Sequence, residues 1–177
     1  MDYVDEMLKR VHIVGGKNSG KTTLVVDLVA YLSGQGHRVG TIKHTHHEHE
    51  LDTPGKDSHL HRLAGAATVG ILSPLLNAVY VVPEQQHDSA ERYEELAPLY
   101  DRCDVVLVEG HLRALAPKLE VWRAVNERAP LVIDEPSIEV IVTDDEQALK
   151  QRYGCSTRVL PRSDLAAVAA EVLCLGK

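Results

Sequence analysis

Residues 15–22 match the pattern G-x-x-x-x-G-K-[ST]; they read Gly15-Gly16-Lys17-Asn18-Ser19-Gly20-Lys21-Thr22. Glycines in such a loop let the backbone curl, so that successive N–H groups point inward at phosphate oxygens. The helix that follows contributes its positive N-terminal end. The stretch therefore predicts a phosphate-binding loop, in which Lys21 reaches the β- and γ-phosphates and the Thr22 hydroxyl is a Mg²⁺ ligand.

The segments on either side of the loop have the structure that this mechanism requires. Residues 10–14 are a short β-branched run, which favours a strand. Residues 22–33 carry apolar side chains at helical spacing, and Gly34 and Gly36 end that helix. The order strand, glycine-rich loop, helix is the beginning of a nucleotide-binding α/β fold.

Strands and helices alternate through the rest of the chain. We expect further strands over 39–42, 68–72, 78–82, 104–109, 118–122, 131–133 and 140–142, with a turn over 73–77. Further helices are expected from 57 or 58 to about 64, over 89–100, from about 146, and over 164–175. We therefore expect one P-loop NTPase-like nucleotide-binding domain over residues 1–177. It would be a three-layer α/β fold whose mostly parallel sheet has helices on both faces.

An acid at the end of a neighbouring buried strand is the second part of such a site. Glu109, followed by Gly110, ends the run 104–109, which is continuously apolar and is typical of a strand buried on both faces. Glu109 would hold Mg²⁺ together with Thr22, or orient an attacking water. Glu109 and Lys21 are therefore the expected catalytic residues, and a solvated acid at a strand end is the alternative interpretation of Glu109.

Composition excludes several classes of protein. The 177 residues carry a formal net charge of -7, which disfavours general nucleic-acid binding. No apolar run has the length that spans a membrane, and the acidic N-terminus is not a secretory signal. The three cysteines are odd in number and far apart, so they indicate reduced thiols in a cytoplasmic protein.

A histidine-rich segment leaves the second strand; it reads Lys43-His44-Thr45-His46-His47-Glu48-His49-Glu50. One interpretation is a metal site, which would need further ligands such as His59 or His61. A second is a polar active-site loop beside the phosphates, and a third is a plain solvated loop. We favour the active-site loop, because adjacent imidazoles of an extended segment fall on opposite faces and no cysteine is near.

Two further residues of this region are candidate ligand contacts. Lys43 leaves the carboxyl end of the second strand, where ligands bind in open α/β sheets. Asp57 follows the turn at Pro54-Gly55 and would face phosphate and Mg²⁺ together with Lys56. The spacing fits a helix cap with a surface lysine equally well.

The order of these motifs resembles the MobB family, the molybdopterin-guanine dinucleotide biosynthesis adaptor proteins. The resemblance runs from about residue 10 to 145 and is carried by the phosphate loop and by I-K-H-T-H-H at 42–47, D-x-P-G-K-D-S at 52–58, A-G-A at 64–66, L-V-E-G at 107–110 and P-K-L-E-V at 117–121. Family members have an aromatic residue and a lysine after V-E-G, whereas this chain has His111-Leu112-Arg113.

The resemblance implies a GTP-binding protein with weak GTPase activity that acts as a homodimer. It also implies a role in attaching GMP to molybdopterin, together with a MobA-type nucleotidyltransferase. When the roles of the family's residues are carried over to this sequence, the resemblance implies that the residues from Gly15 through Thr23 bind phosphate. Thr22 and Glu109 serve Mg²⁺, and residues 43–58 flank the site.

The basis of guanine preference is a separate question, because the chain has no N-K-x-D motif. The stretch Thr143-Asp144-Asp145 follows a late strand, where a carboxylate, which we assign to Asp144, would accept hydrogen bonds from guanine N1 and N2. An N-cap within this stretch for the helix that starts near Glu146 is the alternative interpretation.

Two other functions remain open from the sequence. A small-molecule kinase would use the same loop with an arginine-bearing lid, for which Arg113, Arg123 and Arg128 are available. A nickel-type metallochaperone GTPase is suggested by the histidines.

Overall fold

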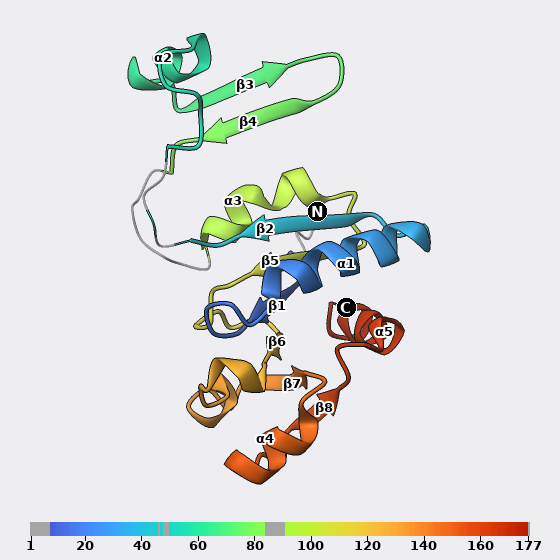
Figure 1. The fold of residues 1–177 in the computed structure, drawn as a ribbon. Helices are drawn as coiled ribbons and strands as arrows, with labels where there is room; N and C mark the ends of the chain where they lie inside the picture. The colour runs from blue at the N-terminus through green and yellow to red at the C-terminus, as the bar shows by residue number, and fades with distance from the viewer. Residues whose placement is uncertain (1–7, 46, 48–49, 84–90, 177) are drawn as a thin grey trace. The chain divides into compact units, whose positions relative to one another are not determined.

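The structure, a computed structural model, describes residues 8–45, 47, 50–83 and 91–176. The chain divides into two compact units, Met1–Thr45 with Tyr93–Lys177, and His46–Arg92. The first unit holds a six-stranded sheet and the second a two-stranded sheet (Figure 1). The expectation of a single domain over the whole chain stays a prediction.

The large sheet is parallel throughout and has the order β2-β5-β1-β6-β7-β8. Its strands are β1 Arg10–Val14, β2 Val39–Lys43, β5 Val105–Glu109, β6 Lys118–Val121, β7 Ile138–Val142 and β8 Arg158–Leu160. All residues of β1 are buried, because helices cover both faces of the sheet. The carboxyl ends of β1, β5 and β2 therefore meet at one edge, where the phosphate loop leaves β1.

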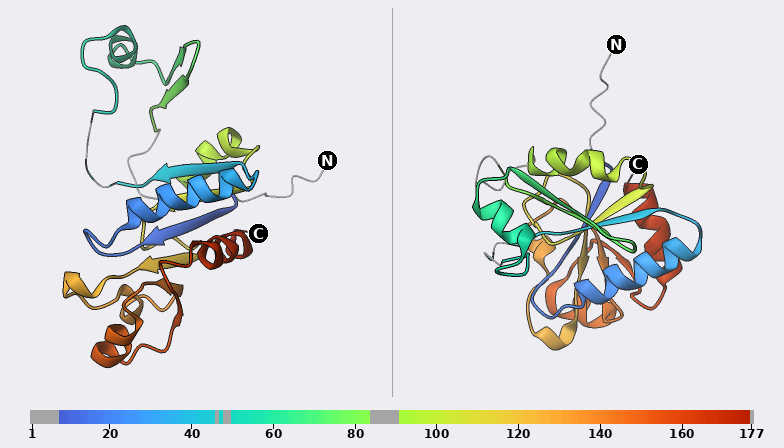
Figure 2. Two further views of the ribbon diagram at one scale, coloured as in Figure 1. Left: turned by 45° about the vertical axis from the view of Figure 1, so that its right-hand side comes forward. Right: turned by 90° about the horizontal axis from the view of Figure 1, so that it is seen from above.

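Helices α1 (Lys21–Gly34) and α5 (Leu165–Leu175) cover one face of this sheet, while α3 (Glu91–Tyr100) and α4 (Glu146–Tyr153) cover the other (Figure 2). Strand side chains alternate between the faces. Ile13 packs in the core beneath α1 and α5, whereas its neighbour Val14 packs in the core that contains Leu149 of α4. The expected three-layer α/β architecture is confirmed.

The second unit contains α2 (Asp57–Leu63) and the antiparallel strands β3 (Thr68–Leu72) and β4 (Asn77–Val81). The expected turn between the two strands is present, with Leu72 paired to Asn77 at its base. These strands form a sheet of their own and do not join the parallel one.

One expectation about the secondary structure was wrong, and one strand was not expected at all. Leu131–Ile133 is a short 3₁₀ helix, η2, and not a strand. Its N–H groups do not join a sheet, because the Glu120 carboxylate accepts from Leu131 N at 2.7 Å and from Val132 N at 3.1 Å. The sequence reading also missed β8, whose three residues lie at the edge of the sheet. The expected helix over 89–100 is described from Glu91 only, since 89 and 90 lie outside the described residues.

Within the described ranges, no helix combines the length and the apolar character that crossing a membrane requires. All three cysteines are free thiols.

Candidate functional site

The phosphate loop joins β1 to α1 through a backbone that only certain residues tolerate. Gly15 has φ +147°, and a Cβ atom there would lie 2.4 Å from the Val121 carbonyl oxygen. Asn18 and Gly20 also have positive φ, at 63° and 95°. Left-handed residues between right-handed ones turn successive N–H groups to the inside of the loop, which creates an anion-binding concavity. The glycine pattern therefore follows from the backbone that phosphate binding needs.

Two polar side chains are held inside this loop. The Lys21 ammonium donates to the carbonyl oxygens of Gly15 at 2.9 Å and Gly16 at 2.8 Å, so it lies across the mouth of the loop. Burial lowers the pKa of Lys21 from its ordinary value, and the nearby Glu109 carboxylate opposes that shift. The Ser19 hydroxyl is buried and has no hydrogen-bond partner among the described residues. An ammonium and an unsatisfied hydroxyl in one concavity suit the oxygens of a phosphate group.

Thr22 and Glu109 come together although 87 positions separate them in the chain. The Thr22 hydroxyl donates to Glu109 Oε1 at 2.8 Å. The parallel register places Glu109 beside Ile13 on one side and Lys43 on the other, at the carboxyl ends of three strands. Mg²⁺ prefers carboxylate and hydroxyl oxygens together with phosphate oxygens. This pair therefore fits a Mg²⁺ ion beside bound phosphates.

A cleft of about 350 Å³ adjoins the loop on the side of β6 and β7. Its walls come from the phosphate loop and the start of α1, from the last residues of β6 and β7, and from the segments after β6, β7 and β8. The lining residues are Ser19, Gly20, Thr23, Val121, Trp122, Arg123, Val142, Thr143, Asp144, Asp145 and Arg162. The cleft lies at the carboxyl ends of parallel strands, the usual place for ligands in an open α/β sheet. Its position and mixed polar and apolar walls suit the nucleoside of a ligand whose phosphates lie in the loop.

The two acids after β7 have different partners. Asp144 Oδ1 accepts from the Ser163 N–H and from the Ser163 hydroxyl, both at 2.8 Å. The Ser163 N–H is the largest cause that lowers the pKa of Asp144 from its ordinary value. Asp145 is the N-cap residue of α4, although its side chain does not cap the helix; Oδ2 instead accepts from Ala124 N at 2.9 Å. Asp144 therefore does not cap α4, and it links the loops after β7 and β8 at the wall of the cleft.

Aromatic rings gather near the residues that follow Glu109 in the chain. His111 follows Gly110 with φ +61°, stacks on His44 at 4.3 Å between ring centroids, and shares a 2.8 Å hydrogen bond with the Tyr93 hydroxyl. His12 is buried below them and donates from Nδ1 to the Gly110 carbonyl oxygen at 3.1 Å. Burial lowers the pKa of His12 to about 4, so its ring is neutral near pH 7. These rings fix the backbone that carries Glu109.

The histidine-rich segment is only partly described, because His46, Glu48 and His49 lie outside the described residues. Across the remaining residues there is no group of three or more histidine, cysteine or carboxylate side chains that could hold a metal ion. His44 lies in the ring cluster, and His59 contacts Glu50 Oε2 at 3.3 Å. The function of this segment as an active-site loop stays a prediction.

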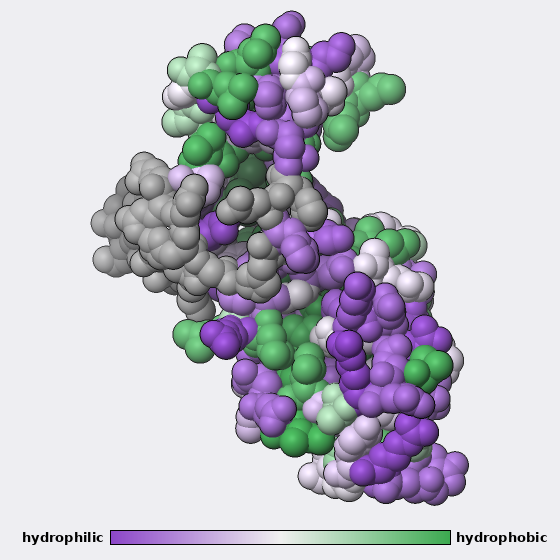
Figure 3. Space-filling view, turned by 60° about the vertical axis from the view of Figure 1, so that its left-hand side comes forward, coloured by the Kyte–Doolittle hydropathy of each residue, from purple (hydrophilic) through white to green (hydrophobic). Residues whose placement is uncertain are grey.

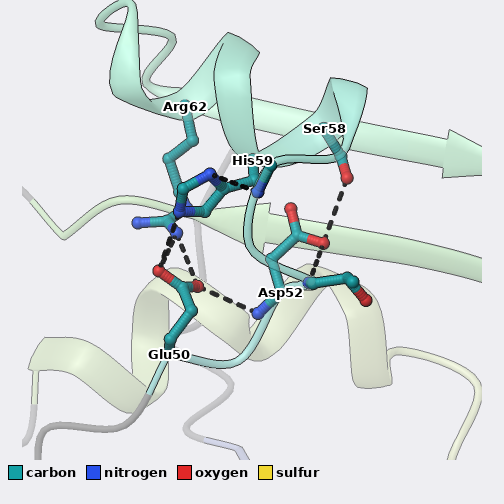
Figure 4. Close-up of polar contacts among 7 residues, drawn as sticks. Glu50, Asp52, Ser58, His59 and Arg62 are labelled. Carbon is teal, nitrogen blue, oxygen red and sulfur yellow. Dashed lines mark hydrogen bonds and ion pairs between the residues drawn. The ribbon is translucent and has the colours of Figure 1, made fainter.

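The D-x-P-G-K-D-S motif is held by its own hydrogen bonds in the second unit (Figure 4). Asp52 Oδ1 accepts from the Thr53 N–H at 2.7 Å and from the Ser58 hydroxyl at 3.1 Å, which joins the two ends of the turn. Glu50 accepts from Arg62 and from the Asp52 N–H; the Asp52 N–H is the largest cause that lowers the pKa of Glu50. Asp57 begins α2 in this same unit, so its part in a nucleotide site stays a prediction.

The structure thus gathers most of the residues expected at the site. The loop residues Gly15–Gly20, Lys21 and Thr22 adjoin Glu109, and Lys43 lies beside Glu109 in the sheet. Thr23 and Asp144 lie on the cleft. Sequence reasoning missed Trp122 and Arg162, which line the cleft but belong to no local motif.

Comparison with known proteins gives a consistent result. The family model described as "MobB: Molybdopterin guanine dinucleotide synthesis protein B" matches residues 10–144, from β1 to Asp144. The molybdopterin-guanine dinucleotide biosynthesis adapter protein of Escherichia coli (strain K12) is 32% identical over 136 residues, which are 76% of this chain and 78% of that protein. The crystal structure of Bacillus subtilis MobB superposes with a TM-score of 0.67 at 23% identity and covers 95% of this chain and 98% of that one.

A more distant likeness concerns the fold alone. The structure of HypB from Helicobacter pylori in complex with nickel has a TM-score of 0.51 at 14% identity and covers 98% of this chain and 89% of that one. The family model, in contrast, spans the phosphate loop, the segment that carries Lys43, and Glu109. The chain belongs to the MobB family.

Proposed function

We propose that this chain is a GTP-binding adaptor of molybdenum cofactor biosynthesis. In this role it binds GTP with Mg²⁺, hydrolyses it slowly, and assists a MobA-type nucleotidyltransferase that attaches GMP to molybdopterin. We propose that the protein is located in the cytoplasm, because the reducing conditions there keep free thiols such as its three cysteines reduced. Family membership supports the pathway, and the geometry of the site supports the nucleotide.

The hydrogen bond between Thr22 and Glu109 is the observation that carries the nucleotide part. In this contact a hydroxyl and a carboxylate lie side by side at the point where the phosphate loop enters α1. Lys21 and the N–H groups of the loop would hold the phosphates, while Thr22 and Glu109 would hold the metal ion. Mg²⁺ supplies positive charge that neutralises the developing charge on the phosphates.

Guanine preference is assigned to the cleft beside the loop. Asp144 lies on its wall, and Oδ2 of Asp144 is the oxygen that Ser163 does not use. A carboxylate that a neighbouring loop already holds in place can accept hydrogen bonds from guanine N1 and N2 at low entropic cost. Adenine presents an acceptor at N1, so the same carboxylate disfavours it.

Calorimetric titration of the full chain with GTP, ATP and GMP, each with and without Mg²⁺, tests this proposal. We expect GTP with Mg²⁺ to bind tightest, ATP to bind at least about tenfold more weakly, and GMP to show no dependence on Mg²⁺. Equal affinity for GTP and ATP would remove the guanine assignment. Absence of Mg²⁺-dependent triphosphate binding would remove the nucleotide function.

We further propose that the chain is a homodimer and that the β3–β4 hairpin lies in the dimer interface. Antiparallel hairpins ordinarily have one apolar and one polar face. Here the exposed face also carries large apolar side chains, because Leu72 is 85% exposed, Val79 49% and Val81 42%. Figure 3 shows hydrophobic side chains on the surface of this unit. A second copy that covers this face would bury those side chains.

Light scattering of the full chain and of Val79→Glu tests the dimer. We expect the mass of two chains for the wild type and of one chain for the variant, because a carboxylate in an apolar interface costs several kcal/mol, about 3 or more. Leu115→Glu is the matched control, since Leu115 is 99% exposed in the other unit and should leave the mass unchanged. A wild-type chain of single mass would contradict the proposal.

A further inference from the structure

Two arginine side chains lie near the phosphate loop, and the nucleotide site proposed above gives neither of them a role. A Cβ atom built on Gly16 would lie 3.7 Å from Arg128 Cδ, and one built on Gly20 would lie 3.9 Å from Arg123 Cδ. Each arginine side chain therefore borders the space that a side chain at Gly16 or Gly20 would fill, near the two ends of the loop. Both residues are exposed, and within the described part of the chain neither guanidinium makes an ion pair.

The segment that carries these arginines is firmly held. Trp122, which is buried, donates from Nε1 to the Arg128 carbonyl oxygen at 2.8 Å. The Ala124 N–H donates to Asp145 at 2.9 Å, and its carbonyl oxygen accepts from Arg152 at 3.2 Å. The buried Glu120 carboxylate holds the N–H groups of η2 just beyond Arg128. The backbone thus presents both arginines to the loop before any ligand binds, which lowers the entropic cost of using them.

Charge around the loop points to an anionic ligand larger than a single phosphate. The chain as a whole has a net charge of -7, yet Lys17, Lys21, Arg123 and Arg128 all lie in or against this loop. Guanidinium groups that lack an acidic partner in an acidic protein bind phosphate oxygens well, because the planar fork matches two oxygens at once.

The two positions differ in which part of a nucleotide they approach. Arg128 lies over Gly16, whose carbonyl oxygen accepts from the Lys21 ammonium, and that ammonium is expected to reach the β- and γ-phosphates. Arg123 lies beside Gly20 at the start of α1 and also lines the cleft assigned to the nucleoside.

We propose that Arg128 binds the terminal phosphate of a bound nucleoside triphosphate and that Arg123 binds its α-phosphate. The inference rests on the proposed nucleotide site and adds that each arginine binds a different phosphate group. Arg128 then distinguishes triphosphate from diphosphate, whereas Arg123 contacts every guanine nucleotide equally.

Calorimetry of Arg128→Gln and Arg123→Gln with GTP, GDP and GMP tests this assignment. Loss of a charge-assisted contact should weaken binding about tenfold. We expect Arg128→Gln to lose that factor for GTP and less than about threefold for GDP. Arg123→Gln should weaken GTP, GDP and GMP by similar factors. Both variants keep the backbone contacts of the segment, so they should fold; the thermal midpoint checks this.

Two comparison variants separate this inference from the proposed function. Arg102→Gln changes an exposed arginine at the amino end of β5, away from the loop, and should leave all three affinities unchanged. Lys21→Ala should lose GTP. If the wild type binds GTP and Lys21→Ala does not, while both arginine variants keep the wild-type affinities, this inference alone is wrong. If the wild type does not bind GTP, or Lys21→Ala binds as well as the wild type, the nucleotide site itself is wrong.

Discussion

We expect Lys21→Ala to lower the affinity for GTP with Mg²⁺ by roughly tenfold to more than a hundredfold. The Lys21 ammonium lies across the mouth of the phosphate loop, held by the carbonyl oxygens of Gly15 and Gly16. A charge-assisted contact to phosphate contributes about 1.5–3 kcal/mol, which corresponds to that range of affinity. Burial lowers the pKa of the ammonium, and the thermal midpoint of the variant checks that it is folded. Isothermal titration at fixed Mg²⁺ measures the change.

The control for this variant is Lys9→Ala, which changes an exposed lysine just before the amino end of β1. Lys9 is at the opposite end of the strand from the loop, so its loss should leave GTP affinity unchanged. A folded Lys21→Ala protein that binds GTP like the wild type would show that residues 15–22 are a structural turn.

We expect Glu109→Gln to retain most GTP binding but to lower the rate of GTP hydrolysis on the order of a hundredfold. Glutamine keeps an oxygen that can accept from the Thr22 hydroxyl, so the 2.8 Å contact between the start of α1 and the end of β5 is expected to survive. What disappears is the negative charge that would hold Mg²⁺ or orient the attacking water. Phosphate release under single-turnover conditions measures the loss, with affinity measured separately.

Asp104→Asn is the matched comparison, because Asp104 precedes the same strand at its other end and accepts from the Arg38 N–H at 2.7 Å. Hydrolysis should not change in that variant. Wild-type hydrolysis by Glu109→Gln would mean that Glu109 is structural and that another acid, with Asp57 the first candidate, orients the water.

Local sequence patterns were sufficient for the parts of this protein that depend on neighbouring residues. The phosphate loop is recognisable because its backbone angles demand glycine at fixed spacing, as at Gly15 and Gly20. The strand ending in Glu109 is recognisable because burial on both faces needs an unbroken apolar run. Short elements were not predicted correctly, because local patterns need several residues to show the spacing of a helix or a strand. The 3₁₀ helix η2 is as apolar as a strand, and its three residues are too few to show which spacing applies.

Only the tertiary structure determined which distant residues share the site. Thr22 meets Glu109, and Arg128 lies over Gly16, because the parallel register and the path of the segment after β6 bring them there. The role of Asp144 as a link to Ser163, and not as a cap for α4, likewise depends on where β8 ends. No spacing in the sequence encodes such contacts, since each depends on how strands separated by many residues pair and pack. The sequence by itself thus determined which residues form the loop and its candidate acid, because their patterns are local, and the fold decided which charged residues surround them.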